Sequence, residues 1–422
     1  MATEKQPEIV KDETTYPRYR WVVLGLMVLT QEVSVLLVGA TGMLLPSMRK
    51  DLGFGAAESG MLGALSQLAS LLIVPATLFF VRFRPKRVYF VALILASAAG
   101  FFIGQSPVFL FLAAFFFLKG LALMIRQIPD TLLRFQWIPK KEFATVMGLT
   151  MGLMNMGQST GIMIVPFLLI LVGGWRNLFS VYALVLALTA IVWAVFARER
   201  ITPAYQQGMA RQDGHSPLRN ALKRKEFTML GIALFGGTVA YTVTMLFLPT
   251  YLLEERGLPL TTIGVIVGLL PIGGVCANIT MGFISDRIGL RKPTMWPPGL
   301  FEFLFYFSLF SPVPVWALFV LAFATGYAAW APMAAIRSIP FELPGVKPSE
   351  IAVGQSMIQT LTTLGTVLGA PLAGFLADSL GSVGTALRIM VVFSLTKVTI
   401  GFLIPETGIK ARSAALRELE KG

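Results

Sequence analysis

Long blocks of apolar residues dominate the pattern along this chain. Residues 21–46, 60–81, 88–104 and 106–118 each lack lysine and arginine, and Glu32 is the only acid within them. A stretch of about 20 such residues is long enough to cross the hydrocarbon layer of a membrane. The backbone there must satisfy its own hydrogen bonds, which leaves helices or a closed barrel. Barrel strands alternate apolar and polar residues, whereas these blocks are apolar throughout, so they predict membrane-spanning helices.

The full pattern predicts an all-α integral membrane protein with twelve transmembrane helices. An even number of crossings places both chain ends on the same side of the membrane. The expected helices lie near residues 20–46, 58–81, 88–105, 107–136, 143–172, 177–197, 227–252, 260–284, 293–310, 313–338, 351–377 and 384–404.

Corresponding residues recur at a nearly constant spacing and indicate two related halves. Pro46 precedes Pro249 by 203 residues, and Gly53 precedes Gly257 by 204. A six-helix repeat returns to the side on which it started, so the two halves are expected to run parallel about an axis along the membrane normal. The expected parts are an amino terminus (1–19), an amino-terminal six-helix bundle (20–197), a linker (198–226), a carboxy-terminal six-helix bundle (227–405) and a tail (406–422).

Composition agrees with this interpretation and excludes several kinds of site. Of the 422 residues, 55% are hydrophobic and 14% are charged, against about 25% charged in an average soluble domain. The chain has one cysteine, Cys276, and one histidine, His215. No disulfide within the chain and no His/Cys metal or catalytic cluster is therefore possible. We expect no enzyme activity, no metal and no cofactor.

The basic residues gather on one side of the predicted membrane. Of 35 lysines and arginines, 26 lie on the side of the termini and 5 on the opposite side. This asymmetry predicts cytoplasmic termini in a multi-pass protein of the cell (inner or plasma) membrane. Topology and contacts with lipid headgroups therefore account for the net charge of +13, and no nucleic-acid partner is expected.

A short motif follows the eighth predicted helix. Residues 282–292 read GFISDRIGLRK, which resembles the G-x-x-x-D-R-x-G-R-R signature of the major facilitator superfamily. The counterpart in the first half, residues 81–87, keeps the basic residues but has Val81 where the acid falls in the signature. The resemblance implies two pseudo-symmetric six-helix bundles, with Asp286 latched to neighbouring helix ends. It implies a gating role for the signature residues Gly282, Asp286, Arg287, Gly289 and Arg291.

Charged residues inside the predicted spans are the strongest indication of a functional site. A charge near the bilayer centre costs from about 3 to over 10 kcal/mol, so such residues usually face a cavity or pair with one another. The fourth helix carries Lys119, Arg126, Asp130 and Arg134 at spacings that place them on one stripe. The stripe either leads an anion through the membrane or forms an internal ladder of ion pairs, in which Arg126 and Asp130 contact each other.

The first helix carries a second candidate. Gln31 and Glu32 lie near its middle, and Glu32 is a lone acid in an uncharged span. Burial disfavours the charged form of a carboxyl, which suits a group that takes up and releases a proton. Alternatively, Glu32 is a fixed partner for Arg126. We expect Glu32 and Asp130 to couple protons to the function.

Polar residues on other helices complete the predicted site. Trp330 and Arg337 are seven residues apart in the tenth helix, and Arg337 either contacts an anion or marks the helix end. Polar faces on the fifth, seventh and eleventh helices either line a cavity or bond helix to helix. Glu302 and Lys397 are expected to form a structural ion pair. The predicted substrate contacts are Arg126, Arg337, Gln31, Tyr241, Trp330, Gln359 and Asn155.

These features predict a monomeric secondary active transporter that works by alternating access. The cationic residues favour a small organic anion such as a carboxylate, with proton symport offsetting its charge. An alternative is a proton-driven exporter of amphipathic or cationic compounds, although Arg126 and Arg337 would repel cations. A non-transporting scaffold or receptor is a remote alternative. No nucleophile–base pair and no phosphate-binding Gly-Lys loop is found in the sequence.

Overall fold

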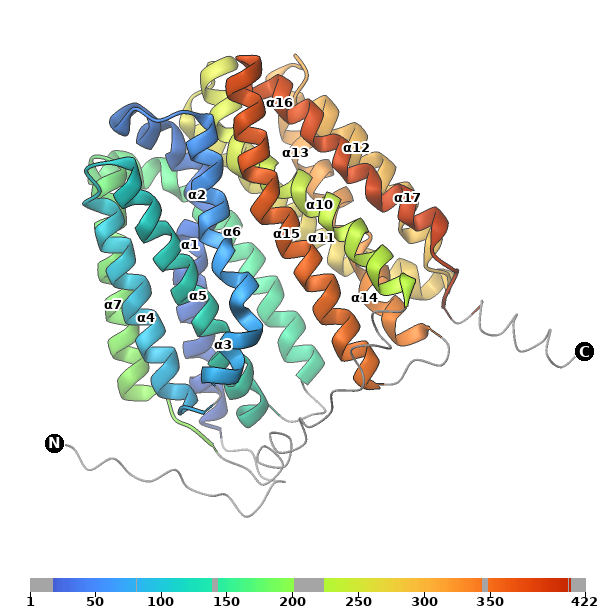
Figure 1. Cartoon of the computed structure of the whole chain (residues 1–422), viewed down its shortest axis with the longest axis horizontal. Helices are drawn as coiled ribbons and strands as arrows, with labels where there is room; N and C mark the ends of the chain where they lie inside the picture. The colour runs from blue at the N-terminus through green and yellow to red at the C-terminus, as the bar shows by residue number, and fades with distance from the viewer. Residues whose placement is uncertain are drawn as a thin grey trace, which may run out of the picture. The chain divides into compact units, whose positions relative to one another are not determined.

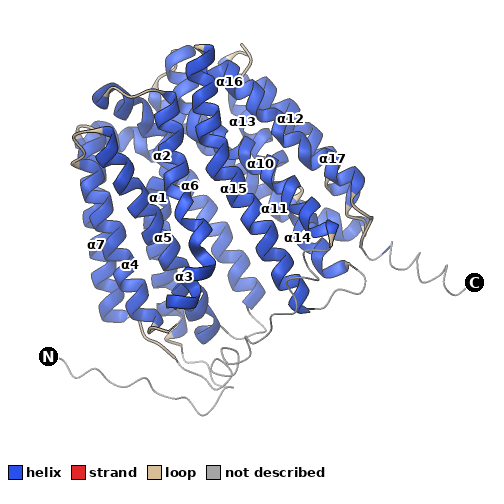
Figure 2. Ribbon diagram, viewed as in Figure 1, coloured by secondary structure: helices blue, strands red, loops and turns tan. Residues whose placement is uncertain are grey.

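The structure is a computed structural model that describes residues 18–80, 82–138, 143–200, 224–343, 348–408 and 410. All regular structure in these ranges is helical (Figure 2). Most of the predicted amino terminus, linker and tail lies outside them.

Each predicted span of the first half corresponds to one helix or to a consecutive run of helices (Figure 1). The second predicted span consists of three pieces, because a 3₁₀ turn separates α2 from α3. The elements are α1 (Arg20–Leu52), α2 (Ala56–Leu68), η1 (Ala69–Leu72), α3 (Ile73–Phe80), α4 (Pro85–Gly104), α5 (Phe109–Trp137), α6 (Phe143–Val172) and α7 (Trp175–Phe196).

The second half follows the same order, and the described elements are consistent with the predicted twelve spans. Within the described ranges, nine helical segments are long and apolar enough by themselves to cross a membrane. The elements are α10 (Lys225–Thr250), η2 (Tyr251–Glu255), α11 (Leu260–Ile288), η3 (Lys292–Thr294), α12 (Trp296–Leu309), α13 (Val315–Trp330), α14 (Met333–Glu342), α15 (Pro348–Leu380), α16 (Val383–Met390), η4 (Val391–Leu395) and α17 (Thr396–Leu403).

Two predicted boundaries were wrong, and proline is involved in both. The first helix was predicted to end at Pro46, but α1 continues to Leu52 with Pro46 inside it. The tenth was predicted to be continuous, but it breaks between α13 and α14 at Ala331 and Pro332. Proline lacks an N–H and so removes one backbone hydrogen bond of a helix. Trp330 and Arg337 therefore do not share the face of one uninterrupted helix.

The chain divides into two compact units. The first comprises residues 1–38, 65–157 and 168–214. Within it α4 packs against both α5 and α7, and Tyr89, Phe116, Phe179 and Trp193 are among its fully buried side chains. These three helices supply much of the frame around the polar residues of α5.

The second unit comprises residues 39–64, 158–167 and 215–422, so it includes the end of α1, the start of α2 and an interior segment of α6. Within it α10 packs along α15 and α11 along α13; α10 and α15 lie side by side in Figure 1. Small residues permit the closest approaches. A Cβ at Gly60 would collide with the backbone of Ala370, and one at Gly42 with the carbonyl oxygens of Met245 and Leu246.

Corresponding glycines support the duplication predicted from the sequence. Gly53 follows α1 with a φ of 70°, and Gly257 follows η2 with a φ of 64°. Both angles lie in the left-handed region that favours glycine. The two halves therefore end corresponding helices with the same backbone conformation.

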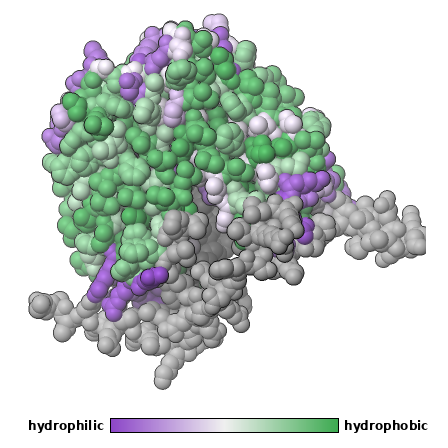
Figure 3. Space-filling view, viewed as in Figure 1, coloured by the Kyte–Doolittle hydropathy of each residue, from purple (hydrophilic) through white to green (hydrophobic). Residues whose placement is uncertain are grey.

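Large apolar side chains cover much of the visible face (Figure 3). Leu171 is 80% exposed, Leu110 78% and Phe283 77%. Apolar surface of this extent is unfavourable in water but is compatible with lipid tails. The exposed side chains therefore support the membrane location of the helices.

Candidate functional site

Within the charged stripe on α5, Asp130 forms an ion pair with Arg134. The Arg134 Nε donates to Asp130 Oδ2 at 2.7 Å, and the Arg134 Nη2 donates to Gln31 Oε1 at 3.1 Å. Asp130 lies four residues from both Arg126 and Arg134, and the acid-before-base order is the more favourable one on a helix. The carboxylate of the stripe is therefore paired with Arg134, and the predicted contact between Arg126 and Asp130 is not among its hydrogen bonds or ion pairs.

Arg126 is held by a neutral group instead. Its side chain is buried, with 9% exposed, and its Nη1 donates to the Tyr89 hydroxyl at 3.0 Å. Its Nε is buried and has no hydrogen-bond partner among the described residues. The guanidinium thus forms no ion pair with the described residues and keeps an unused donor, which is the arrangement that an anion would complete.

Glu32 has an unpaired oxygen in the same unit. Its Oε2 is buried without a hydrogen-bond partner among the described residues. The carboxyl lies against Gly157 of α6, where a Cβ would collide with it. The neighbouring Gln31 donates from Nε2 to the Met154 sulfur at 2.7 Å, so α1 and α6 meet through Gln31 and Glu32. A buried carboxylate oxygen without a donor is costly, and protonation removes most of that cost.

Lys119 does not share this environment. It is 2% exposed, and its Nζ lies 4.6 Å from the ring centre of Phe116 and 5.7 Å from that of Phe179. These distances are typical of cation–π contacts. Lys119 therefore packs between aromatic rings of α5 and α7.

The second unit brings two of the predicted substrate contacts together. The rings of Tyr241 on α10 and Trp330 on α13 lie edge to face, with centroids 5.9 Å apart. Arg337 and Gln359 have exposed side chains. Asn155, in the first unit, is half-buried and forms no side-chain hydrogen bond with the described residues.

Glu302 and Lys397 form the predicted ion pair. Lys397 Nζ lies 3.0 and 2.8 Å from the two carboxylate oxygens and donates to the Ala329 carbonyl at 2.9 Å. The side chains are 0% and 2% exposed. The pair joins α12, α13 and α17 and has the features of a structural contact.

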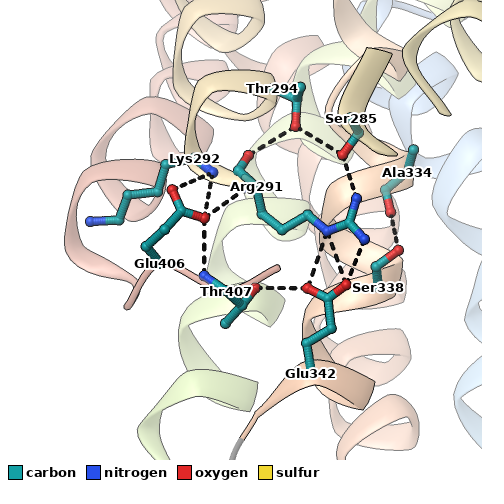
Figure 4. Close-up of polar contacts among 9 residues, drawn as sticks. All are labelled: Ser285, Arg291, Lys292, Thr294, Ala334, Ser338, Glu342, Glu406 and Thr407. Atoms are coloured by element: carbon teal, nitrogen blue, oxygen red, sulfur yellow. Dashed lines mark hydrogen bonds and ion pairs between the residues drawn. The ribbon is translucent and has the colours of Figure 1, made fainter. Parts of the chain in front are cut away.

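The signature motif contributes to a cluster of polar contacts, which we call the signature cluster (Figure 4). Its centre is Arg291, whose side chain forms an ion pair with Glu342 and donates to Ser285 Oγ at 2.6 Å. The backbone N–H of Arg291 donates to Glu406 Oε1 at 2.6 Å, and Thr407 Oγ1 donates to Glu342 at 3.0 Å. The cluster therefore fastens the end of α11 to the ends of α14 and α17.

The other signature residues have different surroundings. Gly289 ends α11 with a φ of 69°, and a Cβ on Gly282 would meet no atom within 4 Å. Arg287 is exposed. The Asp286 side chain, for which a latching role was expected, lies outside the described part of the chain.

Several residues of these networks were not predicted from the sequence. In the sequence, nothing distinguishes Tyr89 from the other aromatic residues of the apolar spans. Glu406 follows Glu199 by 207 residues, and Glu199 accepts from the Lys86 N–H at 2.6 Å as Glu406 does from Arg291. The repeat spacing was the signal that identifies this pair of acids.

Comparisons with known proteins agree with this fold. A curated relative, the probable nitrate/nitrite antiporter of Thermus thermophilus, is 28% identical over 39% of this chain and 38% of its own length. The probable sulfoacetate transporter of Cupriavidus necator is 24% identical over 64% of this chain and 66% of its own. The gallate transporter of Pseudomonas putida is 26% identical over 65% and 68%, respectively. The chain thus matches less than two thirds of the first two relatives.

A solved structure resembles the protein over most of its length. A bacterial homologue of the human lysosomal transporter Spinster, in an inward-facing and unoccupied conformation, superposes with a TM-score of 0.79 at 15% identity. The match covers 92% of this chain and 97% of that one, and it shows the fold alone. The model of the Major Facilitator Superfamily matches residues 27–336 and, in a second match, 230–418. The chain therefore belongs to the Major Facilitator Superfamily, a family of membrane transporters.

Proposed function

We propose that this protein is a secondary active transporter that carries a small organic anion, such as a carboxylate, by alternating access together with a proton. One observation supports the anionic substrate more than any other. Arg126 is buried against the neutral Tyr89 hydroxyl, while Asp130 is paired with Arg134. A buried cation that forms no ion pair is costly, and a bound anion would lower that cost.

The curated relatives favour the same class of substrate. Nitrate, nitrite, sulfoacetate and gallate, the compounds in the names of those proteins, are all anions near neutral pH. Sulfoacetate and gallate each contain a carboxylate. We infer that the substrate of this chain shares that chemistry.

Proton coupling is proposed for Glu32 and Asp130. Glu32 has a buried oxygen without a partner in the described ranges, so it is best accommodated when protonated. An incoming anion and an incoming proton offset each other in charge, which favours symport over exchange.

The remaining predicted residues are assigned to the same process. Gln31, Asn155, Tyr241, Trp330, Arg337 and Gln359 contact the substrate, and the signature residues act in gating. We place the protein as a monomer in the cell (inner or plasma) membrane, with both termini in the cytoplasm.

Uptake into proteoliposomes tests the proposal. Gallate, sulfoacetate and nitrate are offered with an inward proton gradient, and then without one. The proposal predicts gradient-driven accumulation of a carboxylate, which Arg126→Gln reduces at least about tenfold, since one charged hydrogen-bonding partner is lost. Lys119→Met is the matched control, because it removes a buried charge from the same helix away from the Tyr89 contact. Accumulation of a lipophilic cation such as tetraphenylphosphonium instead would contradict the proposal.

A further inference from the structure

Buried hydrogen bonds link Arg126, Tyr89 and Thr30 in series. Tyr89 is 0% and Thr30 1% exposed. Their hydroxyl oxygens lie 2.8 Å apart, and Tyr89 also contacts the Arg126 Nη1 at 3.0 Å. These hydrogen bonds join α5, α4 and α1 within the first unit.

The donor in each of these hydrogen bonds can be assigned from the groups at the two ends of the series. Thr30 has one hydroxyl proton, and its Oγ1 lies 2.9 Å from the Leu26 carbonyl and 3.0 Å from that of Met27. Because carbonyls only accept, Thr30 donates to the backbone and must accept from Tyr89. A guanidinium only donates, so Tyr89 accepts from Arg126. The phenol hydroxyl thus donates once and accepts once, in a fixed direction.

The Tyr89 ring is itself held in place. It stacks on Trp193 with a centroid distance of 4.0 Å and an interplanar angle of 18°. Trp193 donates from Nε1 to the Lys86 carbonyl at 3.3 Å. The acceptor presented to Arg126 therefore has a rigid position.

We infer that Tyr89 is a positioning residue that holds the Arg126 guanidinium apart from Asp130 and so keeps its charge available to an anion. The inference rests on the proposed function. A neutral acceptor fixes the orientation of a guanidinium without cancelling its charge, whereas a carboxylate would do both. Asp130 lies one helical turn from Arg126, within reach of its side chain, so the two acceptors compete for Arg126.

Replacing the phenol tests this competition. Tyr89→Phe keeps the ring and its stack but removes the hydroxyl, so Arg126 is expected to turn to Asp130. The affinity for gallate, measured by calorimetry on the purified chain, should fall about tenfold, since a hydrogen bond to a charged group is lost. Adding Asp130→Asn to this variant should restore most of the affinity. Thr30→Val is the control and should change the affinity less than about twofold, because Tyr89 can still accept from Arg126.

A ligand-free measurement separates this inference from the proposed function. A cryo-EM structure of Tyr89→Phe should show Arg126 in ion-pair contact with Asp130. If that contact forms while no carboxylate binds the unmodified protein, the proposed substrate class is wrong and the positioning role stands. If Arg126 stays in place and the affinity is unchanged, or if Thr30→Val lowers it equally, the positioning role is refuted.

A separate set of contacts carries a second inference, independent of the substrate. Near the end of α15, Asp378 accepts from the backbone N–H groups of Ala56 at 3.0 Å and Ala57 at 2.7 Å. These are among the first N–H groups of α2, which have no acceptor within their own helix. Arg49 and Glu254 form an ion pair at 3.2 Å within the same unit. Both contacts join the amino-terminal half of the sequence to the carboxy-terminal half.

We infer that Asp378 is a latch that fastens the start of α2 to α15 and must release for these helices to separate. Gly374, one turn earlier on α15, makes the contact possible, because a Cβ there would collide with the Ala56 carbonyl. The carboxylate is also placed where the positive end of the α2 dipole favours a negative charge. Alanine at this position would lose both effects, and asparagine would lose the charge but keep one acceptor.

Labelling of a buried reporter tests the latch. Ser59 on α2 is 0% exposed, so Ser59→Cys, in a Cys276→Ser background, reacts with a maleimide only when α2 moves. Asp378→Ala should raise the labelling rate about tenfold, and Asp378→Asn, which keeps one acceptor, by less. Glu255→Ala is the matched control, because Glu255 accepts from the Gly384 N–H at 3.1 Å within one half of the sequence. Equal rates in the parent and both Asp378 variants, or an equal rise in Glu255→Ala, would overturn the inference.

Discussion

At the scale of single residues, the site depends on charged groups that lie against small or neutral neighbours. Glu32 occupies the space that the absent side chain of Gly157 leaves, and Arg126 lies against the Tyr89 hydroxyl. In both cases the neighbour admits the charged group without neutralising it. The site is therefore sensitive to changes of a few atoms beside the charges.

Gly157→Ala should displace the Glu32 carboxyl, because a Cβ at this position would overlap it. The carboxyl is the far end of a flexible side chain, so we expect it to move at little cost in stability, while proton-driven uptake falls because the carboxyl leaves its site. The control is Gly152→Ala on the same helix, whose Cβ would meet nothing within 4 Å. Equal proton-driven uptake by the two variants would contradict the packing of Glu32 against Gly157.

Glu32→Gln should uncouple uptake from the proton gradient. Glutamine keeps the shape of the side chain but cannot release a proton, so exchange of internal for external substrate persists while accumulation against a gradient is lost. Uptake by the unmodified protein should rise as the external pH falls, and that response should flatten in the variant. A variant that still concentrates substrate in response to an acid exterior would exclude Glu32 as the coupling group.

The sequence was informative about some of these residues and silent about others. Glu32, Arg126 and Asp130 were identified because a charge within an apolar span is unmistakable. Tyr89 was not, because a tyrosine in such a span usually packs or faces the interface. Whether Asp130 pairs with Arg126 or Arg134 depends on side-chain rotamers, which spacing alone does not determine.

At the scale of elements, buried polar contacts join helices whose surfaces are otherwise apolar. The pair between Glu302 and Lys397 is enclosed by α12, α13 and α17. Gly237 of α10 also lies against it, since a Cβ there would collide with the Lys397 side chain. Four helices thus meet at one ion pair.

Glu302→Gln should destabilise the protein by about 3–5 kcal/mol, because it leaves a buried ammonium without its counter-charge. Lys397→Met combined with Glu302→Gln should recover part of this loss. The more exposed pair of Arg49 and Glu254 is the comparison, and breaking it should cost at most about 1 kcal/mol. Denaturation of the purified variants measures both, and similar losses would show that burial does not strengthen the first pair.

The prediction of helices from apolar blocks succeeded because helices satisfy the backbone inside a membrane and the blocks lack the alternation of barrel strands. It failed in detail where proline acts. Pro46 lies within α1, whereas Pro332 stands at the break between α13 and α14. Membrane helices tolerate proline, so the residue type alone does not determine where a helix ends.

At the scale of the whole molecule, the sequence repeat and the compact units divide the chain differently. The repeat places residues 39–64 in the amino-terminal half, but these residues pack with the second unit. The repeat spacing identifies equivalent residues, such as Gly53 and Gly257. It does not determine which helix ends are in contact, because a transporter rearranges those contacts as it works.

The charge distribution predicts that both termini face the cytoplasm. Reporter fusions after residues 16 and 422 should therefore be active only for a reporter that works in the cytoplasm, and fusions within 106–108 only for one that works outside. The opposite pattern would reverse the assigned orientation while leaving the fold intact.

Binding of an anion by the charged Arg126 side chain is the centre of the proposed mechanism. Ligand-induced thermal stabilisation measures that binding most directly. A ligand that binds only the folded state raises the apparent stability. Gallate or sulfoacetate should raise the melting temperature of the purified protein and of Lys119→Met, but not of Arg126→Gln. Stabilisation that persists in Arg126→Gln, or that only lipophilic cations produce, would contradict the account.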